Sequence, residues 1–315
     1  MTNIAKHPEA DASLLRRLWI FQSERFPLFK TALLLAVFTS ASISVSAQLA
    51  GRDLPTAFTF ISIWLITMLV FFQMRACDEW KDLEDDRKYR PERPVPSGLI
   101  SLKLLFWIAA SGAVIALVLT ANIFQLLVVL LIVVWAWLGL MTFEFFAPEW
   151  LKKHQTVYLI SHMMIMPLID LFITAAEWMP HSSTPPNALW LFLVLSFANG
   201  CVLEIGRKIW ALESEIEGVD SYSSTMGYRT ATLLWISTCC VAWCLLLAVG
   251  FATGYPIATA LPGFLVLVFL MHTARKFLKN PIQYNEKSVE DAAGIWVFTC
   301  YCFAGFIPQI AGLWS

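Results

Sequence analysis

The sequence predicts an all-α integral membrane protein, and three observations support this fold class. Hydrophobic residues make up 58% of the chain and charged residues only 14%, and the mean hydropathy is +0.66. A soluble globular domain of 315 residues needs far less apolar sequence for its core. Apolar stretches long enough to cross the hydrocarbon core recur along the chain, with the charges gathered between them. We therefore expect a multi-pass helical bundle.

Nine apolar stretches can be delimited in chain order. Two of them approach the lower length limit for a membrane span, so eight spans is the alternative. The stretches cover residues 31–47, 55–72, 102–119, 123–141, 157–175, 189–203, 231–251, 257–271 and 292–313.

The distribution of Lys and Arg predicts the orientation, because short cytoplasmic loops carry an excess of these residues. With nine spans, every Lys and Arg except Arg52 falls in the N-terminal segment or in every second loop. We therefore expect the N-terminus and both charged loops in the cytoplasm. The expected location is a bacterial inner membrane, with an organelle membrane as the alternative.

Two regions organise the chain. Residues 1–30 are too polar for a secretory signal and predict a cytoplasmic segment with an amphipathic helix at the membrane interface. Residues 31–315 predict one transmembrane domain. The net charge of -1 and the lack of a basic, aromatic-rich surface exclude nucleic acid as an expected partner, whereas membrane lipid is expected. The apolar face of the interfacial helix comprises Leu14, Leu15, Leu18, Trp19 and Phe21.

An acid-rich segment follows the second stretch. Asp78, Asp82 and Asp86 recur at every fourth residue, which on a helix places the three carboxylates on one face. Such a segment usually offers its acids to a cation such as Mg²⁺, which prefers oxygen ligands and leaves room for phosphate oxygens. The next residues contain three prolines and a glycine, which predict a stiff loop, and its Arg90 and Arg93 suit a phosphate. The alternative is that acids and bases of this run neutralise one another.

A second charged segment, residues 204–230, follows the sixth stretch. Its acids and bases stand at helical spacing, as Glu204 and Lys208 illustrate. One interpretation is a solvated helix with internal ion pairs. The other is a second Mg²⁺ and diphosphate site, in which Arg207 and Lys208 contact phosphate oxygens. The candidate metal ligands of this second site are Glu204, Glu213, Glu215 and Glu217.

The stretch 157–175 contains His162 and Asp170. An ionisable residue inside a span is costly enough to invite a functional explanation. The two differ by about 80° around a helix, so they could face one cavity. One hypothesis is that one of them accepts a proton during a reaction. The alternative is structural, with Asp170 solvated or paired near the outer end and His162 bonded between helices.

The first charged segment resembles the UbiA superfamily of intramembrane prenyltransferases. The family's first motif, NxxxDxxxD, matches at Asp78, Asp82 and Asp86, with Asp78 in place of the Asn. The stretch that follows in the family, RPxRPxxSGxIS, closely matches residues 90–101.

The second segment resembles the family's second motif, GRExxKDxxDxEGD, only in part. Residues 206–207 and 215–218 align with it without a gap. However, Lys208 replaces a glutamate, Leu212 replaces the first aspartate, and Glu215 replaces the second.

The resemblance implies nine helices around a central lipid-accessible cavity, with both motifs cytoplasmic. It implies a Mg²⁺-dependent prenyltransferase that joins an isoprenyl diphosphate to a lipophilic acceptor. The residues expected to be catalytic are Asp78, Asp82, Asp86, Glu204 and Lys208. Lys152 and Lys153 stand where the family often carries a diphosphate-binding base. The alternatives are a membrane terpene cyclase that ionises the diphosphate without an acceptor, a noncatalytic lipid-binding protein and an ion carrier.

Overall fold

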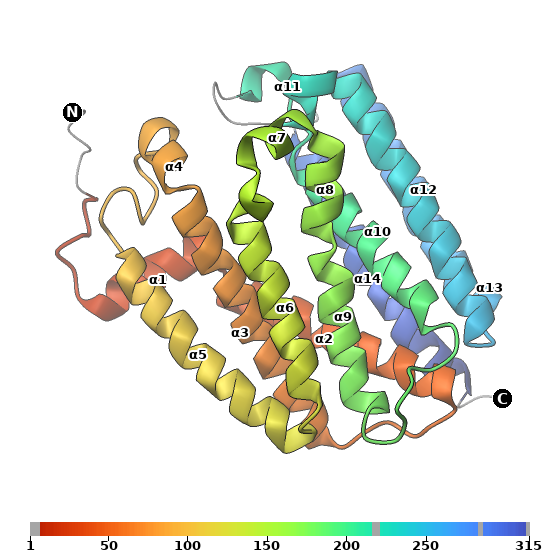
Figure 1. Cartoon of the computed structure of the whole chain (residues 1–315). Helices are drawn as coiled ribbons and strands as arrows, with labels where there is room; N and C mark the ends of the chain where they lie inside the picture. The colour runs from red at the N-terminus through yellow and green to blue at the C-terminus, as the bar shows by residue number, and fades with distance from the viewer. Residues whose placement is uncertain (1–6, 216–220, 283–285, 313–315) are drawn as a thin grey trace.

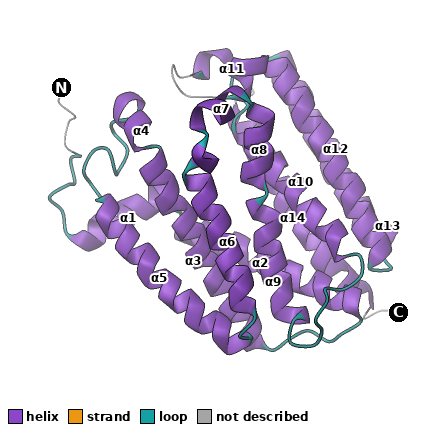
Figure 2. Ribbon diagram, in the orientation of Figure 1, coloured by secondary structure: helices purple, strands orange, loops and turns teal. Residues whose placement is uncertain are grey.

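The computed structural model describes residues 7–215, 221–282 and 286–312, and this part of the chain contains helices and loops but no strand (Figure 2). Long helices form a bundle, and several short helices lie at one end of it (Figure 1). In chain order the elements are α1 (Leu14–Arg25), α2 (Leu28–Ala50), α3 (Ala57–Lys81), α4 (Leu83–Tyr89), α5 (Leu102–Ile123), α6 (Leu127–Thr142), η1 (Glu144–Phe146), α7 (Pro148–Lys153), α8 (Gln155–Met163), α9 (Ile165–Trp178), α10 (Leu189–Arg207), η2 (Leu212–Ser214), α11 (Tyr222–Met226), α12 (Tyr228–Ala252), α13 (Pro256–Lys279) and α14 (Glu286–Gly312).

The long helices form a closed ring in chain order. Helix α2 packs on α3, α3 on α5, α5 on α6, and α6 on α9; then α10, α12, α13 and α14 continue neighbour to neighbour until α14 returns to α2. Contacts of α2 with α9 and of α10 with α14 cross the interior. The most buried helices are the four that make these contacts, α2, α9, α10 and α14. They divide the ring into two halves.

The protein is a multi-pass membrane protein. Eight spans in the described residues are long and apolar enough to cross a membrane: α2, α3, α5, α8 with α9, α10, α12, α13 and α14. Helix α6 has 16 residues and is the shorter apolar helix of the ring. It runs beside α5 and α9 (Figure 1), so the count of nine spans stays a prediction that depends on α6.

A proline explains why the fifth predicted span is broken into two helices. Pro167 lacks an N–H, and its ring opposes the carbonyl of Met163, four residues earlier. Helix α8 accordingly ends at Met163, and α9 begins at Ile165. The break leaves His162 in the last turn of α8, near the end of the bundle that carries the charged segments.

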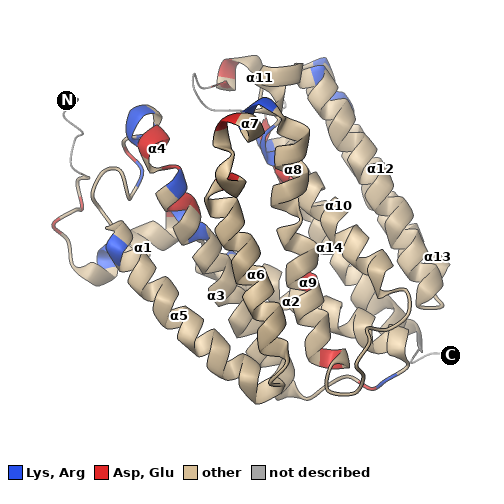
Figure 3. Cartoon of the chain, viewed as in Figure 1, with Lys and Arg blue, Asp and Glu red and all other residues tan. Residues whose placement is uncertain are grey.

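Charged residues gather at the end of the bundle that carries α4, α7 and α11 (Figure 3). At the opposite end, Arg52 forms an ion pair with Glu177, with Nε and Oε1 2.7 Å apart. Ser46 donates a hydrogen bond of 2.6 Å to the other oxygen of Glu177. Both charged segments therefore lie at one end, and whether this end is cytoplasmic stays a prediction.

Four helices meet at Asp170, which is fully buried. Ser42 Oγ lies 2.5 Å from Asp170 Oδ1, and the Tyr301 hydroxyl donates a 2.7 Å hydrogen bond to Oδ2. The Tyr301 hydroxyl also lies 3.2 Å from Ser196 Oγ. These hydroxyls satisfy a buried polar group that would otherwise be costly, and they join α2, α9, α10 and α14.

Helix α1 is present where the interfacial helix was expected, and polar contacts hold it to the bundle. Arg25 Nε lies 2.6 Å from Oε1 of Glu79, a residue of α3 that is 1% exposed. Arg17 donates a 2.7 Å hydrogen bond to the carbonyl of Leu99. Because an unpaired buried carboxylate is costly, the Arg25–Glu79 pair fixes α1 against α3.

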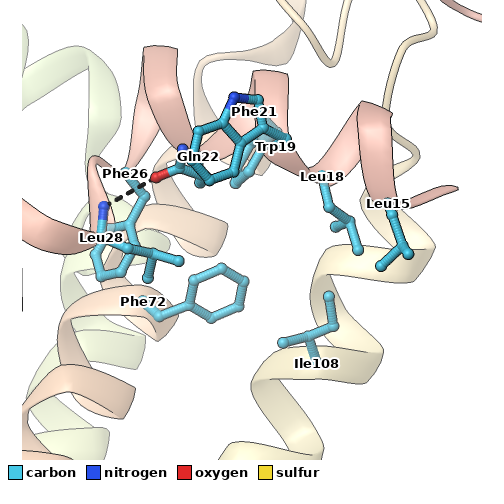
Figure 4. A pocket seen from close by; sticks show the side chains of 9 residues that line it. All are labelled: Leu15, Leu18, Trp19, Phe21, Gln22, Phe26, Leu28, Phe72 and Ile108. Carbon is cyan, nitrogen blue, oxygen red and sulfur yellow. Dashed lines mark hydrogen bonds between the residues drawn. The ribbon is translucent and has the colours of Figure 1, made fainter.

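An apolar pocket of about 380 Å³ lies between α1, α3 and α5 (Figure 4). The one polar side chain in its wall is Gln22, and the Gln22 Oε1 atom accepts a 3.1 Å hydrogen bond from the Leu28 backbone. Phe72 and Ile108 form the side opposite α1. With no charged group in its wall, this pocket is separate from the charged segments. The central cavity expected from the family stays a prediction.

Candidate functional site

The first motif spans a kink between two helices. Helix α3 ends at Lys81 and α4 begins at Leu83, with Asp82 between them at φ -85° and ψ 0°. Backbone hydrogen bonds nevertheless continue, from the Asp82 N–H to the carbonyl of Asp78 (2.9 Å) and from the Asp86 N–H to that of Asp82 (2.8 Å). The helix therefore continues nine residues beyond the predicted span and carries the motif out of the bundle.

The three aspartates of the first motif have different surroundings. The side chains of Asp78 and Asp82 reach solvent, Asp78 being 55% exposed. Asp86 is 4% exposed, and Arg93 Nη1 lies 2.9 and 2.8 Å from its two oxygens. Arg90 Nη1 lies 3.8 Å from Asp86. Asp86 therefore orders the loop that carries Arg90 and Arg93, called the arginine loop below. Asp78 and Asp82 remain accessible.

The environment of Asp82 suits a cation. Although its carboxylate reaches solvent, most of its surroundings are protein, and this burial raises its pKa above the ordinary value. The charges of Asp78 and Asp86 act in the same direction, and Lys81 and Lys208 oppose them. A bound divalent cation would relieve the repulsion between the carboxylates.

The two arginines of the arginine loop lie beside one buried carboxylate. One carboxylate, that of Asp86, faces the two guanidinium groups of Arg90 and Arg93. Burial lowers the pKa of Arg90, and the neighbouring Arg93 acts in the same direction. Two guanidinium groups held on one loop could contact a phosphate group.

In the second motif, Glu204 contacts two cations. Its Oε2 lies 2.6 Å from Arg207 Nη2, and its Oε1 lies 2.8 Å from Lys208 Nζ. Glu204 is only 5% exposed, so these ion pairs are sheltered from water. Electrostatic interactions link Asp78 to Glu204 and Arg207. The two motifs, far apart in sequence, therefore face each other.

Tyr158 of α8 lies between the two motifs, and sequence reasoning missed it. Lys81 Nζ lies 3.0 Å from the Tyr158 hydroxyl and 5.2 Å from its ring centroid. Lys208 Nζ lies 5.4 Å from the same centroid. Lys81 also pairs with Glu144, whose Oε1 is 3.0 Å away. Glu144 lies in the same connection as the basic pair 152–153, and an acid beside candidate phosphate ligands was the signal that could have directed attention to this region.

Glu144 lies in a left-handed turn at the end of α6. Glu144, Phe145 and Phe146 have φ values of 47°, 52° and 57°. Each costs about 1–2 kcal/mol for a residue with a Cβ. The Phe145 ring packs edge-on against Trp137 and His162, with centroids 5.4 and 6.0 Å away. Tertiary contacts therefore hold a backbone that local preference opposes.

His162 presents an unused nitrogen. Its Nδ1 lies 2.9 Å from the carbonyl oxygen of Tyr158, which can only accept, so Nδ1 carries the proton. Nε2 is then a hydrogen-bond acceptor; it is buried and has no partner among the described residues. The rings of His162 and Tyr158 stack with centroids 3.8 Å apart. Asp170, by contrast, already has hydroxyl partners.

The remaining candidates are spread around the same end of the bundle. Lys152 and Lys153 are exposed on the last turn of α7. Glu213 is exposed on η2, whereas both oxygens of Glu215 lie 2.8 Å from Ser221 Oγ. Glu217 lies outside the described residues.

The two motifs differ in how well their acidic side chains could bind Mg²⁺. In the described part of the chain, no three Asp, Glu, His or Cys side chains gather closely enough to hold a metal ion by themselves. Asp78 and Asp82 nevertheless offer two accessible carboxylates, and Mg²⁺ commonly takes one or two carboxylates together with water and substrate phosphates. The first motif therefore fits the ion that the family implies.

Comparison with known proteins identifies the family. Residues 35–299 match the model of the UbiA prenyltransferase family. The chain belongs to this family. The resemblance drawn from the first motif is thus confirmed, and the UbiA region includes both charged segments.

Solved structures support the UbiA fold. The apo structure of a UbiA homologue from Aeropyrum pernix K1 aligns with a TM-score of 0.67 at 16% identity, covering 88% of this chain and 98% of that one. A structure of digeranylgeranylglyceryl phosphate synthase aligns with a TM-score of 0.57 at 17% identity, covering 89% and 98%. At these identities the likeness establishes the fold alone. Among curated proteins, none matches this UbiA-family chain by sequence.

Proposed function

We propose that this chain is a Mg²⁺-dependent intramembrane prenyltransferase that transfers an isoprenyl group from an allylic diphosphate to a lipophilic acceptor. The observation that carries the proposal is the pair of accessible carboxylates, Asp78 and Asp82, facing the cations of the second motif across Tyr158. Membership of the UbiA prenyltransferase family supports the reaction class. The proposed location is a bacterial inner membrane, with the N-terminus and this site on the cytoplasmic side.

The charged groups would bind and orient the diphosphate. When bound, Mg²⁺ stabilises the negative charge that develops on the leaving diphosphate. Asp78 and Asp82 would hold the ion, and surrounding cations would contact phosphate oxygens. The candidates for these contacts are Arg90, Arg93, Lys152, Lys153, Arg207 and Lys208.

Aromatic side chains next to the charged groups would stabilise the allylic carbocation that forms when the diphosphate leaves. Breaking the allylic carbon–oxygen bond leaves a cationic carbon, which π faces stabilise. The Tyr158 ring already lies beside two ammonium groups, Lys81 and Lys208. Its stacking with His162 holds it in place. A prenyl carbon next to this ring would also lie near the Nε2 of His162.

His162 is better placed than Asp170 to accept the acceptor's proton. We expect His162→Ala to lower turnover by about 10²–10⁴-fold, the usual contribution of a general base, with little change in binding of an unreactive diphosphate analogue. An acceptor with a more acidic hydroxyl should show a smaller defect, because it needs the base less. Steady-state rates over a series of acceptors check this.

The control for the His162 variant is His154→Ala, because His154 is exposed at the start of α8. Equal turnover in the two variants would contradict the role of His162. So would a defect that is the same for all acceptors, since a purely structural role would not depend on acceptor acidity.

The proposed function is tested by measuring diphosphate release in nanodiscs with Mg²⁺ and geranyl, farnesyl or geranylgeranyl diphosphate. We expect release only when a membrane lipid extract supplies the acceptor, with a prenylated lipid as product. Release without an extract, together with a cyclic hydrocarbon or alcohol, would replace the proposal with a terpene cyclase. No release under any condition would favour a noncatalytic lipid-binding protein or an ion carrier.

A further inference from the structure

We infer that this protein binds its diphosphate with one metal ion, at Asp78 and Asp82, and that Arg207 and Lys208 provide the positive charge on the opposite side in place of a second ion. The inference rests on the proposed function and specifies how its substrate is held. It follows from three features of the second motif: the occupied oxygens of Glu204, the surroundings of the neighbouring acids, and the position of Lys208.

Glu204 is not available to a metal. Both of its carboxylate oxygens contact cations, Oε2 with Arg207 at 2.6 Å and Oε1 with Lys208 at 2.8 Å. With a side chain 5% exposed, these pairs are hard for water to break. A second metal ion would have to displace both partners and approach two positive charges. Glu204 therefore positions the cations instead of binding one.

Among the described residues, the neighbouring acids do not gather into a group of three that could hold a metal, and Glu213 is exposed on η2. The Ser221 hydroxyl lies 2.8 Å from both oxygens of Glu215, which share its single hydrogen. Leu212, on η2, stands where the family motif has an aspartate. One carboxylate, Glu204, is shared by two cations, Arg207 and Lys208, so these three side chains together carry one positive charge. Such a charge attracts a diphosphate and repels Mg²⁺.

Lys208 points toward the first motif. Its Nζ lies 5.4 Å from the centroid of the Tyr158 ring, which Lys81 approaches to 5.2 Å. Lys208 also interacts electrostatically with Asp82, as Arg207 does with Asp78. A diphosphate that bridges the two motifs would thus contact an ion at the aspartates with some oxygens and the Lys208 ammonium with others.

The inference is tested by counting bound Mn²⁺, which takes the same kind of oxygen ligands as Mg²⁺. The full-length protein in nanodiscs is saturated with an unreactive farnesyl diphosphate analogue, and free Mn²⁺ is followed by electron paramagnetic resonance. We expect one tightly bound Mn²⁺ per chain. Lys208→Glu should raise the number to two, since Glu204 loses a partner and an acid is added beside it.

A second variant guards against failure of Lys208→Glu to fold. Lys208→Gln should still bind one Mn²⁺. Its affinity for the analogue should fall by about tenfold or more, the usual cost of losing a charge-assisted contact. Arg229→Gln is the matched control, because it removes one exposed positive charge at the same end of the bundle. Its analogue affinity should remain within about twofold of the native protein, as expected for a screened surface charge.

The outcomes separate the inference from the proposed function. Two Mn²⁺ per native chain would overturn the one-ion inference and leave the transferase proposal standing. Equal analogue affinity in Lys208→Gln and Arg229→Gln would overturn the role of Lys208. Native protein that binds neither Mn²⁺ nor the analogue would overturn the proposed function and the inference together.

Discussion

Replacing Asp82 by Asn is expected to reduce diphosphate release by about a hundredfold or more. The amide preserves the shape of the side chain but removes one of the two accessible carboxylates of the first motif. A hundredfold loss corresponds to about 2.7 kcal/mol of leaving-group stabilisation, a usual cost of removing one preorganised electrostatic contact. Initial rates at saturating prenyl diphosphate and acceptor, over a range of Mg²⁺ concentrations, measure the effect. The Mg²⁺ concentration needed for half-maximal rate should rise as well.

Asp85→Asn is the matched control for Asp82→Asn. Asp85 is an exposed neighbour in the same acid-rich run and outside the four-residue spacing. It should keep most of the native rate and Mg²⁺ requirement. Similar losses in both variants would indicate a general effect of charge and count against a metal at Asp82, and full activity of Asp82→Asn would exclude that ligand.

Replacing Gly305 by Ala is expected to destabilise the fold by about 1–3 kcal/mol or more, the usual cost of overpacking a close contact. A Cβ at this position would lie 2.5 Å from the Cα and 2.7 Å from the carbonyl oxygen of Ala41. Both are backbone atoms of α2, so neither can move aside cheaply. Small residues permit this approach of α2 and α14, and the Gly305 carbonyl accepts a 2.8 Å hydrogen bond from Gln48 there. The midpoint of thermal unfolding in detergent measures the loss.

The control lies on the same helix. A Cβ at Gly294 would meet nothing within 4 Å. Gly294→Ala should therefore leave the midpoint unchanged or raise it, because alanine favours a helix by about 1 kcal/mol over glycine. A midpoint for Gly305→Ala that equals that of Gly294→Ala would show that α2 and α14 do not approach as closely as described.

Hydropathy predicted the helical bundle but not where its helices end. The second predicted span stops at residue 72, because the apolar residues stop there, whereas α3 continues to Lys81. Backbone hydrogen bonds do not require an apolar face, so the helix continues into the charged run. The break after Met163 had a signal in Pro167, while the left-handed turn at Glu144 had none, since no glycine marks it.

The spacing of acids indicated the candidate site but not the state of each acid. The sequence spacing does not distinguish Asp78, Asp82 and Asp86 from one another. Only the folded loop shows that Asp86 contacts Arg93. Likewise, Lys208 looked like a departure from a metal motif until its contact with Glu204 was seen. Such pairings depend on side-chain directions that a spacing rule does not contain.

The polar contacts between α2 and α9 constrain how the bundle can move. Ser42 meets Asp170 in the interior, and Ser46 meets Glu177 toward the end opposite the charged segments. A single attachment would leave the two helices free to rotate about it, whereas two attachments also fix the angle between them. The α2–α9 pair is therefore held rigidly. Any change in the shape of the bundle is then expected to move the peripheral helices relative to a fixed α2–α9 pair.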